Sequence, residues 1–387
     1  MYKAYKFRLY PNDEQIVLIN KTFGSVRYTY NYYLDKMKNN TYVTPYNNIK
    51  NYEYNLKYEA TFLQEIDSTI IKKSIYKLDD AYKKMFNNQG GYPKFKSKYG
   101  RNSYNTTAIY SKYKGIEQCN IELSLQTRQI KLPKLNLVKI RGYKNINNIS
   151  GKLKNATISK EPNGKYYVSV LYEIPDIKTI AKPRTIVGID IGIKKLLTLS
   201  DGTIINNIHT QEKYQKRIKR KQRELSRKIK GSTNYYKCKK ELAILYSKLA
   251  NSRKYYTHKI TKNITDNYDI IATETLSIKR MITNKQNNLS KSISDAAFQE
   301  ITRQLEYKSK EKGKYFYKIN AYYPSSQICS VCNNQDNKYK DLGERTYSCK
   351  CCKNELDRDF NASVNIMFEG LKLYIKSYAW VIHRMQE

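Results

Sequence analysis

Two pairs of cysteines near the end of the chain have a spacing that suits one metal ion. Cys329 and Cys332 form the first pair, and Cys349 and Cys352 form the second. Each CxxC segment can bend around one ion, so that four thiolates complete a tetrahedron, as in zinc ribbons. Cys351 is a competing ligand, but the two-residue spacing favours Cys352. Because four thiolates leave no open coordination position, we expect a structural zinc ion.

Three acidic residues are notable for their positions: two interrupt or end apolar segments, and one follows the cysteine pairs closely. Asp190 interrupts the apolar segment Ile-Val-Gly-Ile-Asp-Ile-Gly, and Glu274 ends Ile-Ile-Ala-Thr-Glu. Asp359 lies in Asp-Arg-Asp-Phe-Asn-Ala, a few residues beyond the second cysteine pair. A carboxylate at the end of a buried strand needs an ion-pair partner or a metal ion. For each acid taken alone, a salt bridge to a lysine or arginine is the alternative.

Together, the three carboxylates indicate metal-dependent nuclease chemistry. Oxygen ligands suit Mg²⁺, and two such ions about 3.5–4 Å apart can activate water and stabilise a leaving 3′ oxygen. We expect Asp190 to bridge both ions, and Glu274 and Asp359 to complete one ion each. Asp359 is preferred over Asp357 because it directly precedes the Phe-Asn-Ala-Ser start of a helix. Asp357 remains a candidate for a supporting role.

The hydrophobic pattern predicts the elements that position these acids. Short apolar runs at 185–191 and 269–274 are typical of buried strands, and Asp201-Gly202 predicts a tight hairpin turn between 196 and 205. The remaining expected elements are two basic helices over 211–265 interrupted near 231–234, a helix over about 293–313, a strand over 315–323 and a helix from about 360. This β-β-β-α-β-α-β-α order predicts an α/β RNase H-like fold.

The first half of the chain has a different pattern. Residues 2–10 predict a strand, and Pro11-Asn-Asp-Glu predicts the start of a helix with acidic residues in its first turn. Helical spacing continues to about residue 87, and strands and turns follow up to about 180. We therefore expect a helical domain inserted after one strand of a β domain, with a linker near 180–183.

The charge balance indicates a polyanionic partner. The chain has 72 Lys and Arg against 34 Asp and Glu, a formal net charge of +38, and 39 tyrosines that often lie among basic residues. Long nucleic acid fits this composition best, and tyrosine faces suit unstacked bases. A basic protein without a specific partner is the alternative. No run of about eighteen apolar residues or secretory signal is present, and the cysteine usage fits a reducing compartment, so we expect a cytoplasmic protein.

In combination, these motifs resemble the TnpB (OrfB) proteins of bacterial insertion sequences, which are relatives of type V CRISPR effector nucleases. The resemblance covers nearly the whole chain. Its segments are Gly188–Gly192, Glu274 within Ala-Thr-Glu-Thr-Leu, Pro324–Cys329 and Asp357–Ala362, together with Tyr5–Pro11, Phe23–Asn31 and Tyr92–Ser97. The departures are Thr275, where an acid often follows the glutamate, and Asn333 and Lys353, where knuckle glycines are common.

The resemblance implies an RNA-guided DNA endonuclease of a transposable element. A guide RNA from the element end would pair with one target strand, and the protein would read a short motif beside the target in double-stranded DNA. Asp190, Glu274 and Asp359 would carry catalysis with Mg²⁺. The implied domains are a β-barrel-like wedge domain split over 1–10 and 91–180, a helical recognition domain over 11–90, a RuvC-like nuclease domain over 181–324, a zinc ribbon over 325–353, and the last part of the RuvC-like domain with a tail over 354–387. We expect a monomer.

Other functions compete with this interpretation. A single-strand transposase needs a His-hydrophobic-His pair, but His209, His258 and His383 are the only histidines and none are neighbours. A non-catalytic RNA- and DNA-binding regulator, or an accessory transposase protein, stays open as the main alternative. A Holliday-junction resolvase shares the fold but would not need the N-terminal half.

Overall fold

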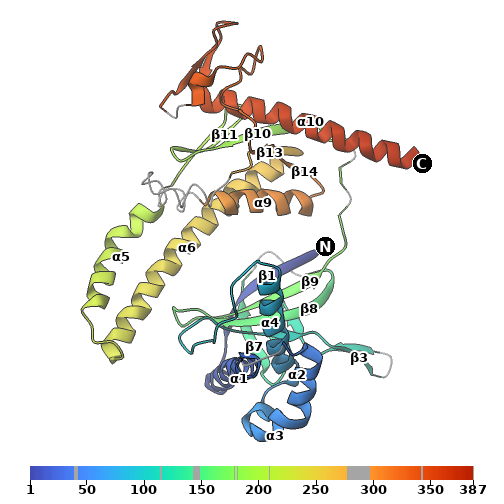
Figure 1. Ribbon diagram of the computed structural model, residues 1–387, viewed down its shortest axis with the longest axis vertical. Helices are drawn as coiled ribbons and strands as arrows, with labels where there is room; N and C mark the ends of the chain where they lie inside the picture. Colours follow the sequence, from blue (N-terminus) through green and yellow to red (C-terminus); the bar gives the residue numbers. More distant parts are fainter. Residues whose placement is uncertain are drawn as a thin grey trace. The chain divides into compact units, whose positions relative to one another are not determined.

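Two compact units make up the part of the chain that the computed structural model describes (Figure 1). They are Met1–Asp176 and Ile177–Glu387. The described residues are 1–38, 42–113, 116–142, 149–177, 179–180, 182–208, 210–276, 297–340 and 343–386. No helix among these residues is long and apolar enough to cross a bilayer.

The first unit begins with one strand and a group of helices. β1 spans Tyr2–Tyr10, and it is followed by α1 (Asp13–Lys38), α2 (Pro45–Asn51), a π-helical turn (Tyr52–Leu56), α3 (Lys57–Glu59), a 3₁₀ turn (Thr61–Glu65) and α4 (Ser68–Phe86). α4 begins where the Asp67 carboxylate accepts a hydrogen bond of 2.7 Å from the backbone N–H of Thr69. This bond satisfies one of the free donors of the first helical turn. The helices expected up to about residue 87 are therefore present.

A seven-stranded antiparallel sheet forms the rest of this unit, in the order β2-β8-β9-β1-β7-β6-β5. Its further strands are β2 (Asn102–Thr107), β5 (Glu122–Ser124), β6 (Gln129–Leu132), β7 (Asn136–Arg141), β8 (Lys152–Lys160) and β9 (Tyr166–Glu173), and a separate hairpin joins β3 (Tyr110–Tyr113) to β4 (Ile116–Cys119). Phe7 and Leu9 of β1 are fully buried in one core with residues of α1 and α4, such as Ile19 and Ile71. Since successive strand residues point to opposite faces, the residues between them lie on the other face of the sheet.

The second unit contains a five-stranded sheet in the order β12-β11-β10-β13-β14. Its strands are β10 (Ile186–Ile191), β11 (Lys195–Leu199), β12 (Ile204–Asn206), β13 (Ile270–Thr273) and β14 (Tyr315–Lys318). β10, β11 and β12 pair antiparallel, whereas β10, β13 and β14 run parallel. The predicted hairpin is present, and Gly202 adopts φ = 88° in its turn, a conformation that glycine accepts without strain.

Helices α6 (Thr233–Asn267), α9 (Phe298–Glu311) and α10 (Arg358–Gln386) pack on the second sheet, whereas α5 (Thr210–Ser226) lies beside α6, away from the sheet (Figure 1). Val187 and Ile189 of β10 pack in one core with apolar residues of α6 and α9. Gly188 faces the other way, where a Cβ atom would lie only 2.1 Å from the Ser363 carbonyl oxygen of α10. α10 therefore lies directly on β10, on the face opposite α6 and α9.

Two predicted boundaries in this unit differ from the structure, and a third lies outside the described residues. The strand expected over 315–323 ends at Lys318, because the Asn320 side chain accepts the backbone N–H of Tyr322 at 2.9 Å and turns the chain. The last helix begins at Arg358, two residues earlier than expected. α9 begins at Phe298, and the predicted start of this helix at 293 lies outside the described residues.

Candidate functional site

Four cysteine thiols meet in the segment between β14 and α10. Within the described residues, the sulfur atoms of Cys329, Cys332, Cys349 and Cys352 all lie within 4.8 Å of one another, and Cys351 is not part of the group. Cys329 and Cys352 are 3.7 Å apart at sulfur, and Cys332 and Cys349 are 3.5 Å apart. A tetrahedral zinc ion with Zn–S bonds of about 2.3 Å places its sulfurs about 3.8 Å apart. The donor set and its spacing therefore fit zinc, with the ligands that the spacing predicted.

The two cysteine segments have the same backbone geometry. Asn333 and Lys353 adopt φ angles of 59° and 60°, and their backbone N–H groups donate to the carbonyl oxygens of Cys329 and Cys349 at 2.9 and 3.0 Å. Glycine is common at such left-handed positions because it has no Cβ penalty. Lysine is less suited to this conformation, and the structure has it there nevertheless. A short antiparallel pair, β15 (Thr346–Ser348) and β16 (Glu355–Asp357), completes the segment.

The register of two parallel strands brings two of the predicted carboxylates together. Gly188 of β10 is aligned with Ala272 of β13, and Asp190 and Glu274 each follow two residues later. Because side chains alternate along a strand, these acids lie on the same face as Gly188 and Ala272, the face that α10 covers. Asp190 and Glu274 thus project from neighbouring strand ends toward the helix that carries Asp359.

Asp357 lies directly before α10 and Asp359 lies within its first turn, and the two aspartates have different roles there. The Asp357 carboxylate accepts hydrogen bonds of 3.1 Å from the backbone N–H groups of Asp359 and Phe360, and its other oxygen pairs with Lys195 Nζ at 2.6 Å. It therefore acts as the helix cap. Asp359 lies inside the helix, not directly before it as expected, because the Asp357 cap starts the helix earlier.

The electrostatics of the three carboxylates show mutual repulsion. Burial raises the pKa of Asp190 well above its ordinary value, and the negative charges of Glu274 and Asp359 raise it further, against the positive charge of Arg358. Burial also raises the pKa of Glu274, and the hydrogen bond from Ser325 and the charge of Arg358 oppose this rise. Within the described residues, no lysine or arginine nitrogen lies within 4.0 Å of the three carboxylates. The salt-bridge alternative for each acid is therefore not found there.

The carboxylates do not form one tight ligand group. In the described part of the chain, the four cysteines are the only set of three or more ligand residues close enough to share a single ion. Two ions about 3.5–4 Å apart do not require all their carboxylates around one centre. Asp190, Glu274 and Asp359 are therefore close enough to repel one another, but their oxygens do not surround one centre.

Hydrogen bonds connect the cysteine segment, which lies between β14 and α10, to Glu274 and to α10. These bonds were not predicted from the sequence. The Ser325 hydroxyl donates to Glu274 Oε1 at 2.5 Å. The amide nitrogens of Asn361 and Asn365 on α10 both donate to the Ile328 carbonyl oxygen, at 2.7 and 2.6 Å, and the N–H of Ser330 donates to Asn361 Oδ1 at 2.9 Å. Both asparagines are buried. The four-residue spacing of Asn361 and Asn365, which puts both on one helix face, was the sequence feature that could have indicated this contact.

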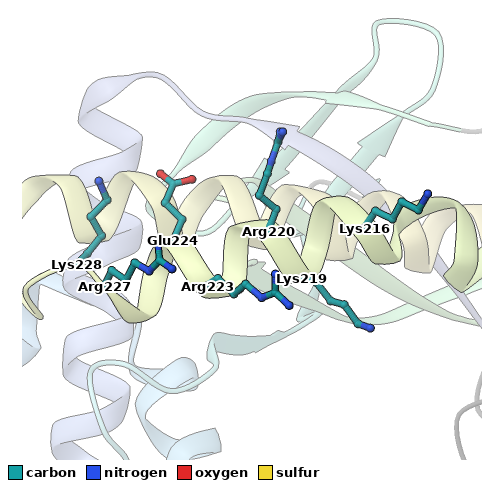
Figure 2. Close-up of a pocket in the computed structure, with 7 residues that line it drawn as sticks. All are labelled: Lys216, Lys219, Arg220, Arg223, Glu224, Arg227 and Lys228. Atoms are coloured by element: carbon teal, nitrogen blue, oxygen red, sulfur yellow. The ribbon is translucent and has the colours of Figure 1, made fainter.

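A second feature of this unit is a basic surface along α5 (Figure 2). Its side chains surround an open hollow of about 730 Å³ and include only one acid; they are Lys216, Lys219, Arg220, Arg223, Glu224, Arg227 and Lys228. Glu224 pairs with Lys221 at 2.8 Å, so it offsets little of this charge. We name these residues the α5 surface. Such a density of cations along one helix suits a phosphate backbone.

Comparison with known proteins identifies the family. The model OrfB_IS605, described as a probable transposase, matches residues 169–285; a Cas12f1-like TNB domain model matches 298–366 and an OrfB helix-turn-helix model matches 1–43. A protein of Streptomyces pristinaespiralis is 30% identical over 378 residues, which cover 95% of this chain and 89% of the relative. The chain belongs to the TnpB (OrfB) family. An Escherichia coli K12 relative is 29% identical over 388 residues, 95% of this chain and 92% of its own, and both relatives carry the name "Putative RNA-guided DNA endonuclease", in the second case with the addition InsQ.

Solved structures agree with this TnpB assignment at the level of the fold. The cryo-EM structure of a Cas12f1-sgRNA-target DNA complex aligns with a TM-score of 0.57 at 14% identity, covering 95% of this chain and 98% of the Cas12f1 chain. The match extends over nearly the full length of both proteins. This TnpB family member therefore has the fold of the small Cas12f effectors.

Proposed function

We propose that this protein is an RNA-guided DNA endonuclease of a transposable element, which cuts target DNA next to a short target-adjacent motif. The observation that supports the proposal is the alignment of β10 with β13, which puts Asp190 and Glu274 on the sheet face toward α10, the helix that carries Asp359. The charges of the three carboxylates repel one another there. The names of the two relatives that match almost the whole chain support the same activity. The net charge of +38 supports a nucleic-acid partner.

The nuclease domain in this proposal is RNase H-like and of the RuvC type. Its support is the strand order β12-β11-β10-β13-β14 with the first three strands antiparallel and the last three parallel. In open sheets of this kind, sites form beyond the carboxyl ends of the parallel strands. Asp190 and Glu274 occupy these ends. The same chain region carries the cysteine segment, for which we propose a structural zinc ion.

For catalysis, we propose that Asp190, Glu274 and Asp359 hold two Mg²⁺ ions. When bound, these ions supply activation of the attacking water and charge stabilisation at the scissile phosphate. The protein's own contribution is positioning. Ser325 holds one oxygen of Glu274, and Asp357 caps the helix that carries Asp359. The positive charge of Arg358 opposes the rise in the pKa values of Asp190 and Glu274 and so favours the ionised forms that bind metal.

For the guide RNA, we propose binding along basic surfaces of both units, including the α5 surface. Seven residues line this surface, and six of them are cations. Guide pairing would read the target sequence, while the protein would recognise the backbone and the adjacent motif. This division requires many sequence-independent contacts, which a lysine-rich protein provides.

The direct test is to express the gene with its flanking DNA, purify the protein and sequence the RNA that accompanies it. A discrete RNA that ends in a variable segment from just beyond the element supports the proposal and supplies the target for cleavage assays. Random cellular RNA bound to a folded protein contradicts it. The second candidate, a non-catalytic regulator, is favoured if the discrete RNA is present but a matched target is bound and never cut.

A further inference from the structure

One row of side chains crosses the second sheet from its edge to Asp190. Asp190 of β10 is directly opposite Thr198 of β11, and Thr198 is directly opposite Ile204 of β12. Directly opposite residues on antiparallel strands project from the same face of the sheet. Since Asp190 lies on the face that α10 covers, Thr198 and Ile204 lie on that face too. The row therefore leads from the edge strand to the candidate catalytic acids.

A hollow of about 290 Å³ lies over the outer part of this row. Its lining combines residues of β11, β12 and the turn between them with residues at the start of α10; they are Lys195, Thr198, Gly202, Ile204, Asp357 and Phe360. We name these six residues the Phe360 pocket. None of the three acids is among them, but Phe360 directly follows Asp359 in α10. The pocket therefore borders the acids without being part of their site.

The size and lining of the Phe360 pocket suit one flat, mostly apolar group. Ile204 is 49% exposed, so it leaves apolar surface in contact with water, and covering such surface is favourable. Phe360 adds an aromatic ring, on which a nucleobase can stack. The volume is at the lower end of the range of about 300–1,000 Å³ that is usual for small-ligand sites. The pocket therefore has room for a single base but not for a base pair.

Lys195 supplies a positive charge to the Phe360 pocket. Its Nζ atom pairs with Asp357 Oδ2 at 2.6 Å, and the two side chains are 29% and 44% exposed. An ion pair this accessible to solvent contributes little to stability, so the lysine can turn to a phosphate at small cost. Asp357 keeps its role as helix cap, because the backbone N–H groups of Asp359 and Phe360 bind its other oxygen, Oδ1. An apolar pocket and a cation thus lie side by side, as one nucleotide requires.

We propose that the Phe360 pocket holds one unstacked base of the DNA strand that is cut, next to the scissile phosphate, and that Lys195 contacts the phosphate beside this base. The identity of the ligand as the cut strand rests on the proposed function. A base that is paired and stacked in a duplex is not free to enter the pocket, so the pocket accepts only a single strand. Because it borders the acids, the base held there determines which phosphate reaches them. The pocket therefore sets the position of the cut along the strand.

The test uses the full-length protein with its co-purified RNA and a matched target whose cleavage position has been mapped. A single abasic residue is moved one position at a time across the cut, and each target is cleaved under single-turnover conditions. We expect the wild type to cut about tenfold more slowly when the abasic residue replaces one base beside the cut, because the stacking of that base is lost. Abasic residues at the other positions near the cut should have much smaller effects.

Protein variants show whether this base lies in the Phe360 pocket. Ile204→Ser and Phe360→Leu should cut the intact target about tenfold more slowly, and the abasic residue should then cause little further loss. Ile375→Ser is the matched control, because Ile375 is also half-exposed, at 56%, and lies about 22 Å further along α10 than Phe360. This control should keep the wild-type rate and the wild-type sensitivity to the abasic residue.

A neutral methylphosphonate in place of the phosphate beside the base tests Lys195 in the same way. It should slow the wild type, and it should slow Lys195→Gln no further than that variant is already slowed. If Lys195 only supported the fold through Asp357, the methylphosphonate would slow Lys195→Gln as much as it slows the wild type, and the assignment of Lys195 would be overturned.

Two outcomes would overturn the pocket itself. One is a wild type that no abasic residue beside the cut slows, and the other is an undiminished abasic effect in both Ile204→Ser and Phe360→Leu. The Tm of each variant checks its folding, and Ile204→Ser should keep the wild-type Tm because its side chain is half-exposed. If the wild type does not cut the matched target at all, the proposed function fails. A short single-stranded DNA with one 2-aminopurine still tests the pocket, because stacking on Phe360 should quench its fluorescence, and equal quenching by Phe360→Leu would refute the pocket.

Discussion

Substitution of Gly188 by alanine tests whether the contact between α10 and β10 positions the carboxylates. The added Cβ would lie 2.1 Å from the Ser363 carbonyl oxygen and 2.4 Å from the backbone nitrogen of Met367. Real Cβ atoms essentially never approach such atoms more closely than 3.0 Å, so α10 has to move by about 1 Å. Both obstructing atoms belong to the backbone, so no side-chain rotation relieves the clash.

The expected magnitude follows from that displacement. A shift of about 1 Å between groups that act together can lower a rate by about 10²-fold, and overpacking of this kind costs about 1–3 kcal/mol of stability. Gly188→Ala should therefore cut a matched target about a hundredfold more slowly than the wild type. Guide and target binding should change little, because the substituted residue is internal to the second unit.

The assay is single-turnover cleavage of a labelled target by the protein–RNA complex, together with the Tm of each variant. Gly24→Ala is the matched control, because Gly24 lies within α1 and a Cβ there meets nothing within 4 Å. This control should retain cleavage and become slightly more stable, since alanine favours a helix by up to about 1 kcal/mol. If Gly188→Ala cleaves at the wild-type rate with an unchanged Tm, the positioning argument is wrong.

Three further predictions concern zinc, pH and salt. Cys352→Ser should lose the bound zinc, measured by metal analysis, whereas Cys351→Ser should keep one zinc per chain; equal zinc contents would contradict the ligand assignment. Burial and the charge of Lys77 lower the pKa of Lys96 to about 7 from 10.5. The unfolded state therefore binds more protons between these values, and the free energy of unfolding should rise with pH from about 7 to 10. Lys96→Met should flatten that rise in denaturant titrations, and an unchanged profile would refute the assignment to Lys96. Changing Arg220 and Arg223 of the α5 surface to glutamine should reduce the salt slope of RNA binding by about 1 to 2, and an unaltered slope would exclude this surface from the RNA interface.

The elements that carry the acids could be predicted because the physics is local. A charged group at the end of a short apolar run is expensive, so Asp190 and Glu274 were recognisable from neighbouring residues alone. The Asp201-Gly202 turn also depends on a few adjacent residues. These features could therefore be predicted from the sequence alone.

Features that depend on distant residues could not be predicted. The alignment of Gly188 with Ala272 pairs residues that are 84 positions apart in the sequence, and Asp190 lies beside Glu274 only because of this pairing. The contacts of Asn361 with the cysteine segment likewise require the position of α10. Lys353 adopts a left-handed backbone conformation that a lysine disfavours. We infer that the turn of the chain around Cys349 and Cys352 requires this conformation.

The most direct test of the central claim is cleavage of a target plasmid by the complex of protein and co-purified RNA, with wild-type protein and with Asp190→Asn. The plasmid carries a sequence complementary to the variable segment of the RNA, and a scrambled sequence serves as the control. We predict that the wild type cuts only the matched plasmid in Mg²⁺, and that Asp190→Asn binds the same target without cutting it. Cleavage by Asp190→Asn at the wild-type rate, or cutting that ignores the match, would contradict the proposal.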